Sequence, residues 1–325
     1  MDEIAATIQP AMRRVALIYN PASGQYSARR AAIIREAMDL LRSAGKEAEA
    51  METYAPGSAA LHADEAIRRG FDTIFACGGD GTVHEILQRL VGTPVALGVL
   101  PMGTANALAQ DLGLGRSPLK AVRALLAASP MQVPVGRIFY RDSFGAEQSR
   151  YFTVAAGVGA DALLMSRLDA ELKRRFGYVL YLIEALHVWA TSPFPLFKAV
   201  LTKSPGKPPR VEHVSQLLAV RVRSFGGALG KLAPGATLRK GALRLLAFKT
   251  RSRFRYLTFL LAVTVGRHTF HRHVELLEVD TAECTSLDGD PIYVEADGEV
   301  LGTLPARMEI ASQKLTLLVP AGAQP

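Results

Sequence analysis

The feature that most constrains this chain is the stretch at residues 73–85, TIFACGGDGTVHE, which joins an apolar run to a helical pattern through a glycine-rich turn. The apolar run, residues 73–77, has the length and composition of a buried strand. Glycine has no Cβ, so the backbone of Gly-Gly-Asp-Gly-Thr at 78–82 can come close to a bulky anion. A helix that begins directly after the turn would direct free N–H groups and the positive end of its dipole at a phosphate. The stretch therefore predicts a strand, a phosphate-binding turn and a helix in succession.

Asp80 is the unexpected residue in this turn, because a carboxylate repels a phosphate unless a cation or a ribose hydroxyl lies between them. The turn matches neither the phosphate loop that ends in Gly-Lys-Ser/Thr nor the Rossmann glycine fingerprint, so it would be a different nucleotide-binding device. Thr82 and Glu85 have the spacing of a capping box, which predicts where the helix begins. The alternative is a tight structural turn in which Asp80 hydrogen-bonds its own loop.

Two other predicted strands end in loops of the same kind. Residues 15–19 are followed by Asn-Pro-Ala-Ser-Gly at 20–24, and residues 95–100 are followed by Pro-Met-Gly-Thr-Ala-Asn at 101–106. Strands that alternate with helical patterns predict a parallel sheet. The loops at the carboxyl ends of parallel strands line the ligand crevice of such a sheet. We therefore expect a nucleotide site at this edge.

The character of the chain changes after Pro130. From there, predicted strands follow one another at 131–139, 150–156, 215–223, 242–248, 274–285 and 292–296, interrupted by a helical segment at 161–190. Successive strands are typical of an antiparallel domain. We predict an α/β chain with an N-terminal Rossmann-like parallel sheet domain at 1–133 and a C-terminal, mainly antiparallel β-sandwich domain at 134–325. The tail at 306–325 is expected to pack back on the first domain.

The composition indicates a globular protein in a reducing compartment. Of its 325 residues, 49% are hydrophobic and 21% are charged, which is ordinary for a folded domain. Its two cysteines make no disulfide framework. The first 14 residues lack the apolar core of a signal peptide, and the longest apolar run, residues 256–265, is shorter than the roughly 20 residues that span a bilayer. We therefore expect a cytoplasmic protein that does not cross the membrane.

Positive charge is concentrated in one segment. Residues 198–274 hold 16 Lys and Arg against one acid, Glu212, whereas residues 275–325 hold 2 Lys and Arg against 10 acids. Such a segment calls for an anionic partner, and no nucleic-acid motif accompanies it. We predict reversible contact with an anionic membrane surface at the inner membrane face. Pairing of these charges with the acidic tail stays open, and so do both shallow insertion and core packing of the loop at 194–197.

With these motifs in place, the chain resembles the diacylglycerol/sphingosine lipid kinase family, and most of all its soluble bacterial members related to diacylglycerol kinase. The resemblance runs from about Arg14 to Pro320. It implies transfer of the γ-phosphate of ATP, with Mg²⁺, to the hydroxyl of a lipid such as diacylglycerol or a sphingoid base, at a cleft between two domains. The motifs that carry it are those at 20–24, 78–82 and 101–106, Ala-Gly-Val-Gly-Ala-Asp-Ala at 156–162, and Glu-Ala-Asp-Gly-Glu at 295–299.

The resemblance also implies roles for individual residues. The catalytic set would be Glu299 as the proton acceptor, Asp297 as its acidic partner, and Asp80, which is also the expected Mg²⁺ contact. The residues themselves leave another interpretation open for Asp297, since Asp-Gly between apolar strands is a strong hairpin-turn signal. The residues expected to contact the nucleotide are Asn20, Pro21, Ala22, Ser23, Gly24, Thr53, Gly78, Gly79, Asp80, Gly81, Thr82, Val83, His84, Gly103 and Thr104.

Three places depart from the family pattern. Lys240 and Arg244 stand where many members carry aspartates that bind a structural Mg²⁺, so we expect no such metal in the second domain. A fixed ammonium or guanidinium could stand where that cation would be. Pro134 stands where an aspartate often helps to organise the catalytic Mg²⁺, which puts more of the Mg²⁺ positioning on Asp80. Ala107, after Asn106, also stands where the family usually has an aspartate. The nucleotide loops and the acidic pair remain, so the resemblance still implies an active enzyme.

Two other classes of protein stay open. An NAD kinase would share the Gly-Gly-Asp-Gly-Thr loop, but the Asn-Pro-Ala-Ser-Gly loop and the basic segment argue against it. A nucleotide-responsive membrane-binding protein without turnover would fit the missing aspartates, but the retained acids argue against it. The identity of the lipid and the oligomeric state, including a homodimer, are left open by the sequence.

Overall fold

The computed structural model describes residues 12–21, 29–160, 162–163, 194–203, 206, 208–225, 232–264, 273–289 and 291–323. They belong to two compact units. The first unit comprises Met1–Gly103, Leu112–Val133 and Gln313–Gln324, and the second comprises Thr104–Asp111, Pro134–Ser312 and Pro325. The predicted helical segment at 161–190 and the loop residues 22–24 lie largely or wholly outside the described residues.

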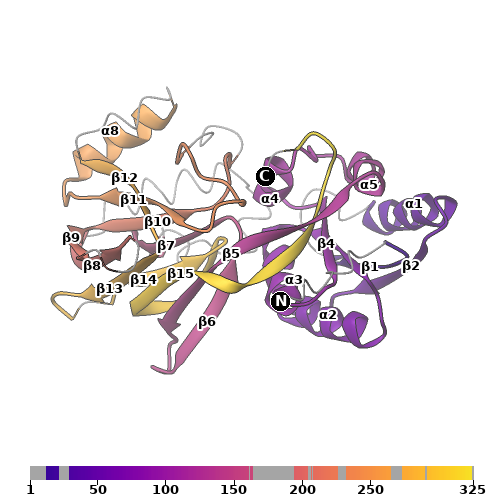
Figure 1. Ribbon diagram of the computed structural model, residues 1–325, viewed down its shortest axis with the longest axis horizontal. Helices are drawn as coiled ribbons and strands as arrows, with labels where there is room; N and C mark the ends of the chain where they lie inside the picture. Colours follow the sequence, from indigo (N-terminus) through magenta and orange to yellow (C-terminus); the bar gives the residue numbers. More distant parts are fainter. Residues whose placement is uncertain are drawn as a thin grey trace, which may run out of the picture. The chain divides into compact units, whose positions relative to one another are not determined.

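The first unit is a parallel sheet covered by helices (Figure 1). Its strands run in the order β4-β3-β1-β2, and the C-terminal part of β15 pairs with β4, also in parallel. The elements are β1 (Arg14–Tyr19), α1 (Arg30–Ser43), β2 (Glu47–Glu52), α2 (Ser58–Arg68), β3 (Thr73–Gly78), α3 (Asp80–Leu90), β4 (Ala96–Pro101) and α5 (Pro118–Leu126). The predicted N-terminal parallel sheet is thereby confirmed.

Burial explains the sequence pattern of these strands. All six residues of β3 and of β4 are buried, because α1 packs with α5, α2 packs with α3, and the two pairs lie on opposite sides of the strands in Figure 1. A strand covered on both faces reads as a continuous apolar run. β2 is the last strand of the row, and of its residues only Met51 is buried, as expected for an edge strand.

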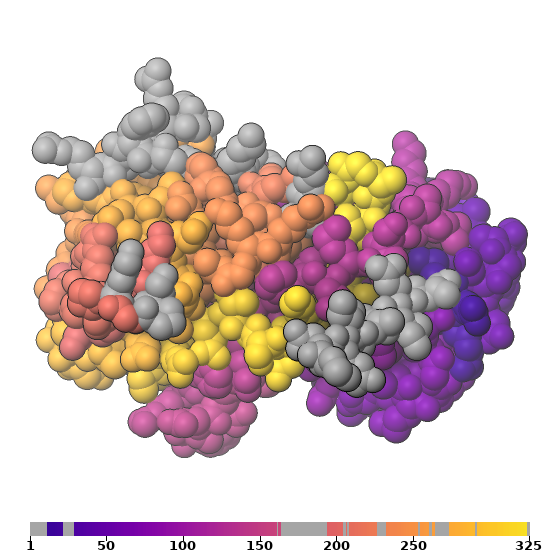
Figure 2. Space-filling model, in the orientation of Figure 1, coloured from indigo at the N-terminus to yellow at the C-terminus, as the bar shows by residue number. Residues whose placement is uncertain are grey.

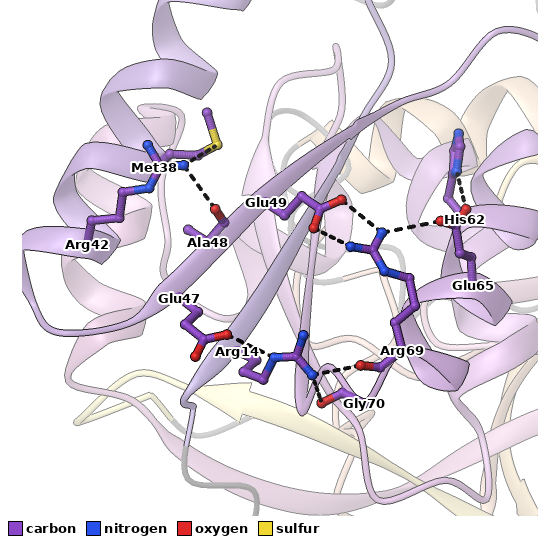
Figure 3. A network of polar contacts seen from close by, with 10 residues as sticks. All are labelled: Arg14, Met38, Arg42, Glu47, Ala48, Glu49, His62, Glu65, Arg69 and Gly70. Carbon is purple, nitrogen blue, oxygen red and sulfur yellow. Dashed lines mark hydrogen bonds and ion pairs between the residues drawn. The ribbon is translucent and has the colours of Figure 1, made fainter.

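The amino ends of the strands carry a network of exposed ion pairs, shown in Figure 3. Arg14 at the start of β1 pairs with Glu47 at the start of β2 at 3.0 Å and donates to the carbonyl oxygen of Arg69 at 2.7 Å. Arg69 in turn bonds the carboxylates of Glu49 and Glu65. Exposed pairs of this kind contribute little to stability. The network lies at the amino edge of the sheet. The glycine-containing loops lie at the opposite, carboxyl edge.

The second unit is built from antiparallel strands in two rows. One row runs β12-β11-β10-β7-β14-β15, the other runs β9-β8-β13-β15, and β5 pairs with β15 and β6. Its elements are α4 (Ala107–Asp111), β5 (Ser129–Arg141), β6 (Glu147–Phe152), β7 (Ala155–Gly159), β8 (Phe197–Thr202), β9 (Arg210–Val214), β10 (Gln216–Val220), β11 (Leu243–Phe248), α8 (Arg253–Thr264), β12 (Val274–Val279), β13 (Thr281–Ser286), β14 (Tyr293–Ala296) and β15 (Glu299–Val319). β5 and β15 each continue from one unit into the other.

A single apolar core joins the two rows. It contains Val158, Leu217 and Leu245 from the first row together with Phe197 and Ala282 from the second, all at most 1% exposed. Two rows of strands that share a core are the arrangement of a β-sandwich, so the predicted antiparallel C-terminal domain is also confirmed. The described residues of both units contain no helix that is long and apolar enough to cross a membrane.

Two of the predicted strands are in fact pairs of strands. The predicted strand at 150–156 breaks into β6 and β7 at Thr153 and Val154, whose N–H groups are bonded to a side-chain carboxylate instead of a neighbouring strand. The predicted strand at 274–285 breaks at Asp280, where the chain leaves β11 as its partner and takes β8. Each break is decided by a partner distant in sequence, which a periodic pattern does not record.

Candidate active site

Three loops meet at the carboxyl edge of the parallel sheet in the first unit. In the strand register Tyr19 lies beside Cys77, and Gly78 lies beside Pro101. β1, β3 and β4 therefore end at the same level, as the sequence predicted. The backbone N–H of Thr53 donates to the carbonyl oxygen of Tyr19 at 2.9 Å, so this predicted nucleotide residue, which directly follows β2, adjoins the edge too.

The loops after β3 and β4 are in direct contact through glycine. The N–H of Met102 donates to the carbonyl oxygen of Gly78 at 3.0 Å. A Cβ added to Gly79 would lie 3.3 Å from the Cα of Gly103, and a Cβ added to Gly78 would lie 2.3 Å from the Oγ1 of Thr82. The glycines are thus required for the two loops and the start of α3 to come this close.

Arg30, at the start of α1, ties the third loop to the other two. Its guanidinium donates to the carbonyl oxygens of Asn20, after β1, and of Met102, after β4, the latter at 3.1 Å. The side chain is only 1% exposed, and burial lowers the pKa of Arg30 from its ordinary value. Sequence reasoning missed this residue, although its spacing from the apolar residue Ile34 places it on the buried face of α1.

The start of α3 differs from the prediction in one respect. The helix begins at Asp80, with Gly79 as its extended N-cap, and no side chain caps it. Glu85 instead accepts the N–H groups of Gly57 at 2.9 Å and Ala59 at 3.0 Å, at the start of α2. The predicted capping box is therefore wrong, because Glu85 is on the face of α3 that packs against α2. The N-terminus of α3, with the half-buried Asp80 in its first turn, adjoins the glycine contacts.

The remaining predicted nucleotide residues are placed as follows. Val83 and His84 are buried on α3, Gly81 is half-buried, Thr104 is exposed, and Pro21 directly follows the Arg30-bound Asn20. Ala22, Ser23 and Gly24 lie outside the described residues.

The acidic pair lies in the second unit at the turn between β14 and β15. Ala296 pairs with Glu299, so Asp297 and Gly298 form a two-residue turn, both with positive φ. The hairpin-turn interpretation of this dipeptide is thus correct. The carboxylate of Asp297 accepts three N–H groups, from Thr153 at 3.0 Å, from the next residue at 2.8 Å and from the one after it at 3.0 Å.

These bonds separate the roles of the two acids. Asp297 is 9% exposed and its carboxylate is directed at the β6–β7 backbone, whereas Glu299, two residues later, is exposed at the first position of β15. Asp297 therefore holds the turn in place, and Glu299 is the member of the pair whose side chain faces solvent. An exposed carboxylate on a fixed turn can accept a proton from a bound hydroxyl.

The loop before β11, where the sequence departs from the family pattern, is held by a buried guanidinium. Arg221 is 1% exposed and donates to the carbonyl oxygens of Lys240 at 2.8 Å, Ala242 at 3.0 Å, Leu238 at 3.0 Å and Pro134 at 2.9 Å. Burial lowers the pKa of Arg221 to about 10. Among the described residues no three His, Cys, Asp or Glu side chains gather as a metal site.

The two basic side chains that the sequence singled out, Lys240 in this loop and Arg244 on β11, have other partners. Lys240 pairs with Glu278 at 2.8 Å, and the Nε of Arg244 donates to the carbonyl oxygen of Pro234 at 3.0 Å. The positive charge bound by the carbonyl oxygens of this loop is thus the guanidinium of Arg221, which directly follows β10.

Comparison with known proteins agrees with these motifs. Residues 14–138 match the model of the diacylglycerol kinase catalytic domain, and residues 153–319 match that of the YegS C-terminal NAD kinase beta sandwich-like domain. A diacylglycerol kinase of Bacillus subtilis (strain 168) is 24% identical over 312 residues, covering 95% of this chain and 97% of the relative. One of Staphylococcus carnosus (strain TM300) is 25% identical over 317 residues, covering 95% of each.

A solved structure shares the fold. It comes from Bacillus anthracis str. Sterne, where it is described as a candidate diacylglycerol kinase, and it superposes with a TM-score of 0.75 at 18% identity over 96% of both chains. Together the two domain models account for most of the sequence, in the same order as the two predicted domains. The chain therefore belongs to the diacylglycerol kinase family, in which a kinase catalytic domain precedes a YegS-type C-terminal domain.

Proposed function

We propose that this chain is an ATP-dependent lipid kinase that transfers the γ-phosphate of ATP to the hydroxyl of a lipid such as diacylglycerol or a sphingoid base. The observation that carries the proposal is the meeting of three loops at one sheet edge, joined by Arg30 and by the contact of Gly79 with Gly103. The acceptor class rests on the names of the relatives, which are diacylglycerol kinases.

The loops suit a nucleotide triphosphate because they bring backbone close together at a helix N-terminus. Such a terminus offers N–H groups and a positive dipole end to phosphate oxygens. Asp80 in the first turn of α3 suits Mg²⁺, which keeps several waters and takes one or two carboxylates beside the phosphates. When bound with ATP, Mg²⁺ neutralises charge on the phosphates. Binding and orienting the phosphates would then be the task of the first unit.

Glu299 is the proposed proton acceptor for the lipid hydroxyl. Its carboxylate is exposed, and the turn that presents it is fixed by the three bonds to Asp297. In this proposal Asp297 acts through Glu299 and touches no substrate. The protein would work in the cytoplasm, in reversible contact with the anionic face of the inner membrane where its lipid resides.

The test is transfer of labelled phosphate from ATP to a panel of acceptors in mixed micelles. The panel contains diacylglycerol, sphingosine, ceramide and NAD. We expect transfer to at least one lipid and none to NAD. Asp80→Asn and Glu299→Gln should each lower kcat by about 100-fold or more. Glu36→Gln on α1 and Glu147→Gln on β6, both exposed, are the matched controls and should keep wild-type activity.

Two results would contradict the proposal. Transfer to NAD alone would identify an NAD kinase. Nucleotide binding without turnover on any acceptor would identify a nucleotide-responsive binding protein. If Asp80→Asn kept most of the wild-type rate, the glycine turn would be structural.

A further inference from the structure

Helix α8 is fixed to the second unit by an aromatic cluster on one of its faces. The ring of Tyr256 stacks on Phe194 with centroids 4.4 Å apart and on Phe248 at 4.7 Å, and Phe259 meets Phe248 edge-on at 4.4 Å. The hydroxyl of Tyr256 donates to Gln216 at 2.8 Å. Phe194 is buried in this cluster, so insertion of the loop at 194–197 into a membrane is not supported.

The other face of α8 combines an aromatic side chain with positive charge. Phe254 is 75% exposed, Arg255 follows it on the helix and is exposed, and Arg251, two residues before the helix begins, is exposed as well. Residues 249–273 contain six Lys and Arg, three His and no acid. Within the described part of the chain neither Arg251 nor Arg255 lies in an ion pair with a carboxylate, and the guanidinium of Arg255 lies 3.4 Å from the Nδ1 of His273. Because an α-helix turns once in about 3.6 residues, Tyr256 can lie on the buried side of α8 while Phe254 and Arg255 lie on the exposed side.

Several other charges of the basic segment are matched inside the unit. Arg210 bonds Glu275 through two nitrogens at 2.8 Å, and Lys249 lies 2.6 Å from the same carboxylate and 2.9 Å from Glu212. Lys240 pairs with Glu278. Pairing with the acidic tail is thus correct for these residues. It leaves the exposed face of α8 as a place where unmatched positive charge accompanies an apolar side chain.

A second exposed phenylalanine, Phe144, lacks the positive charge that accompanies Phe254. Phe144 is 95% exposed at the tip of the β5–β6 hairpin, which projects from the second unit (pink in Figure 2) at the end away from α8 (Figure 1). Its neighbours Arg141, Asp142, Glu147 and Arg150 carry balanced charge. A single exposed apolar side chain is ordinary on a protein surface. Phe144 has no charge field that would select an anionic surface.

We infer that α8 is the element that docks this protein on an anionic lipid bilayer, with Phe254 inserted among the headgroups and Arg251 and Arg255 against the lipid phosphates. A helix that lies in the interface with an aromatic side chain inward and basic residues at headgroup level is a known mode of reversible membrane binding. The inference deepens the proposed function, because a kinase that acts on a membrane lipid has to meet the bilayer.

The test is co-sedimentation of the full chain with vesicles, without nucleotide. Vesicles of phosphatidylcholine alone are compared with vesicles that contain phosphatidylglycerol, at low and high salt. We expect binding to the anionic vesicles only, weakened by salt. Arg251→Gln with Arg255→Gln should weaken binding by about 25-fold, roughly fivefold per charge, and Phe254→Ser by about tenfold. Phe144→Ser is the matched control and should bind as the wild type does.

Thermal melts show whether each variant is folded, and all four substituted positions are exposed, so the melting temperature should not change. Wild-type affinity in the α8 variants, or binding that is indifferent to lipid charge and salt, would overturn the inference. Tighter binding to single-stranded RNA than to anionic vesicles, lost in the same variants, would overturn it in favour of a nucleic-acid surface. Vesicle binding as expected, together with no lipid phosphorylation, would support docking and refute the proposed kinase activity.

Discussion

At the scale of the residue, Arg30 shows how a buried charge can organise the loops at one edge of a sheet. Removing a guanidinium from water is costly, and burial lowers the pKa of this one. The cost is offset by bonds to carbonyl oxygens, which a planar group with five donors can satisfy at two places at once. Because Asn20 and Met102 belong to different loops, Arg30 sets the distance between the loops after β1 and β4.

We therefore expect Arg30→Met to raise the KM for ATP by about tenfold or more, since misplaced loops bind phosphate poorly, while the KM for lipid stays the same. The KM of Arg30→Lys for ATP should lie between that of the wild type and that of Arg30→Met, because one ammonium cannot reach both carbonyls in the same way. Arg35→Met, exposed on the same helix, is the control. Steady-state kinetics with each substrate varied in turn, and the rise in melting temperature with ATP, are the measurements. Equal changes in both KM values would show that Arg30 serves only general stability.

The two cysteines are also expected to respond to burial. Both are buried and free, and burial raises the pKa of the Cys77 thiol and that of the Cys284 thiol, the latter to about 12. In the unfolded chain these thiols lose their protons above pH 9.0, whereas in the folded chain they keep them. The unfolded state is then favoured, so stability should fall as the pH rises above 9.

Two measurements check this prediction. A thiol reagent at about pH 8 should label neither cysteine until denaturant is added. Urea unfolding from about pH 8 to 10.5 should show a smaller loss of stability in the Cys77→Ala/Cys284→Ala variant than in the wild type. Rapid labelling of the native protein would contradict the buried positions.

At the scale of the element, one side chain holds a loop that has little regular structure of its own. The segment before β11 offers three carbonyl oxygens, of Leu238, Lys240 and Ala242, to the guanidinium of Arg221. A fourth bond goes to Pro134 on β5. The side chain thus ties the loop to a strand of the same unit, and its removal would leave four carbonyl oxygens, buried or partly buried, without this donor.

Arg221→Met should accordingly lower the free energy of unfolding by about 3 kcal/mol or more. Arg221→Lys should recover only part of the loss, because its single ammonium cannot serve four carbonyls. Arg239→Met, exposed in the same loop, should change stability by less than about 0.5 kcal/mol. Urea denaturation provides the measurement, and a loss below about 1 kcal/mol for Arg221→Met would show that other contacts hold the loop.

At the scale of the whole molecule, positive charge is distributed unevenly along the chain. Residues 1–133 hold 13 Lys and Arg against 13 acids, so the excess of +8 arises beyond them. In the second unit, Arg221 already supplies a cation to the loop where the family pattern places a structural metal. We expect Mg²⁺ to be needed for turnover with ATP and not for the stability of the fold.

Mg²⁺ alone should therefore leave the melting temperature unchanged, whereas Mg²⁺ with ATP should raise it. A ligand at 100 times its dissociation constant stabilises the native state by about 2.7 kcal/mol. Differential scanning fluorimetry with Mg²⁺, ATP and both together is the measurement, and Ca²⁺ without nucleotide is the control for nonspecific divalent binding. A clear rise with Mg²⁺ alone would reveal a structural metal site in the protein.

Much of this protein follows from local sequence. Apolar runs at β1, β3 and β4 and the glycines or prolines after them identify a parallel sheet and the loops at its carboxyl edge, because burial on both faces and tight turns constrain neighbouring residues. The Asp-Gly turn before β15 is local in the same sense. These signals identify the fold class and the positions of the loops that are proposed to bind the nucleotide.

The tertiary structure decided which side chains serve which backbone. Asp297 holds amides that lie up to 144 residues away, Glu85 caps a helix up to 28 residues before it, and Arg30 reaches a carbonyl 72 residues away. It also decided which face of α8 is buried, since the aromatic partners of Tyr256 come from other elements. Each of these contacts depends on how distant segments pack. The local sequence around a polar side chain does not indicate which distant group will become its partner.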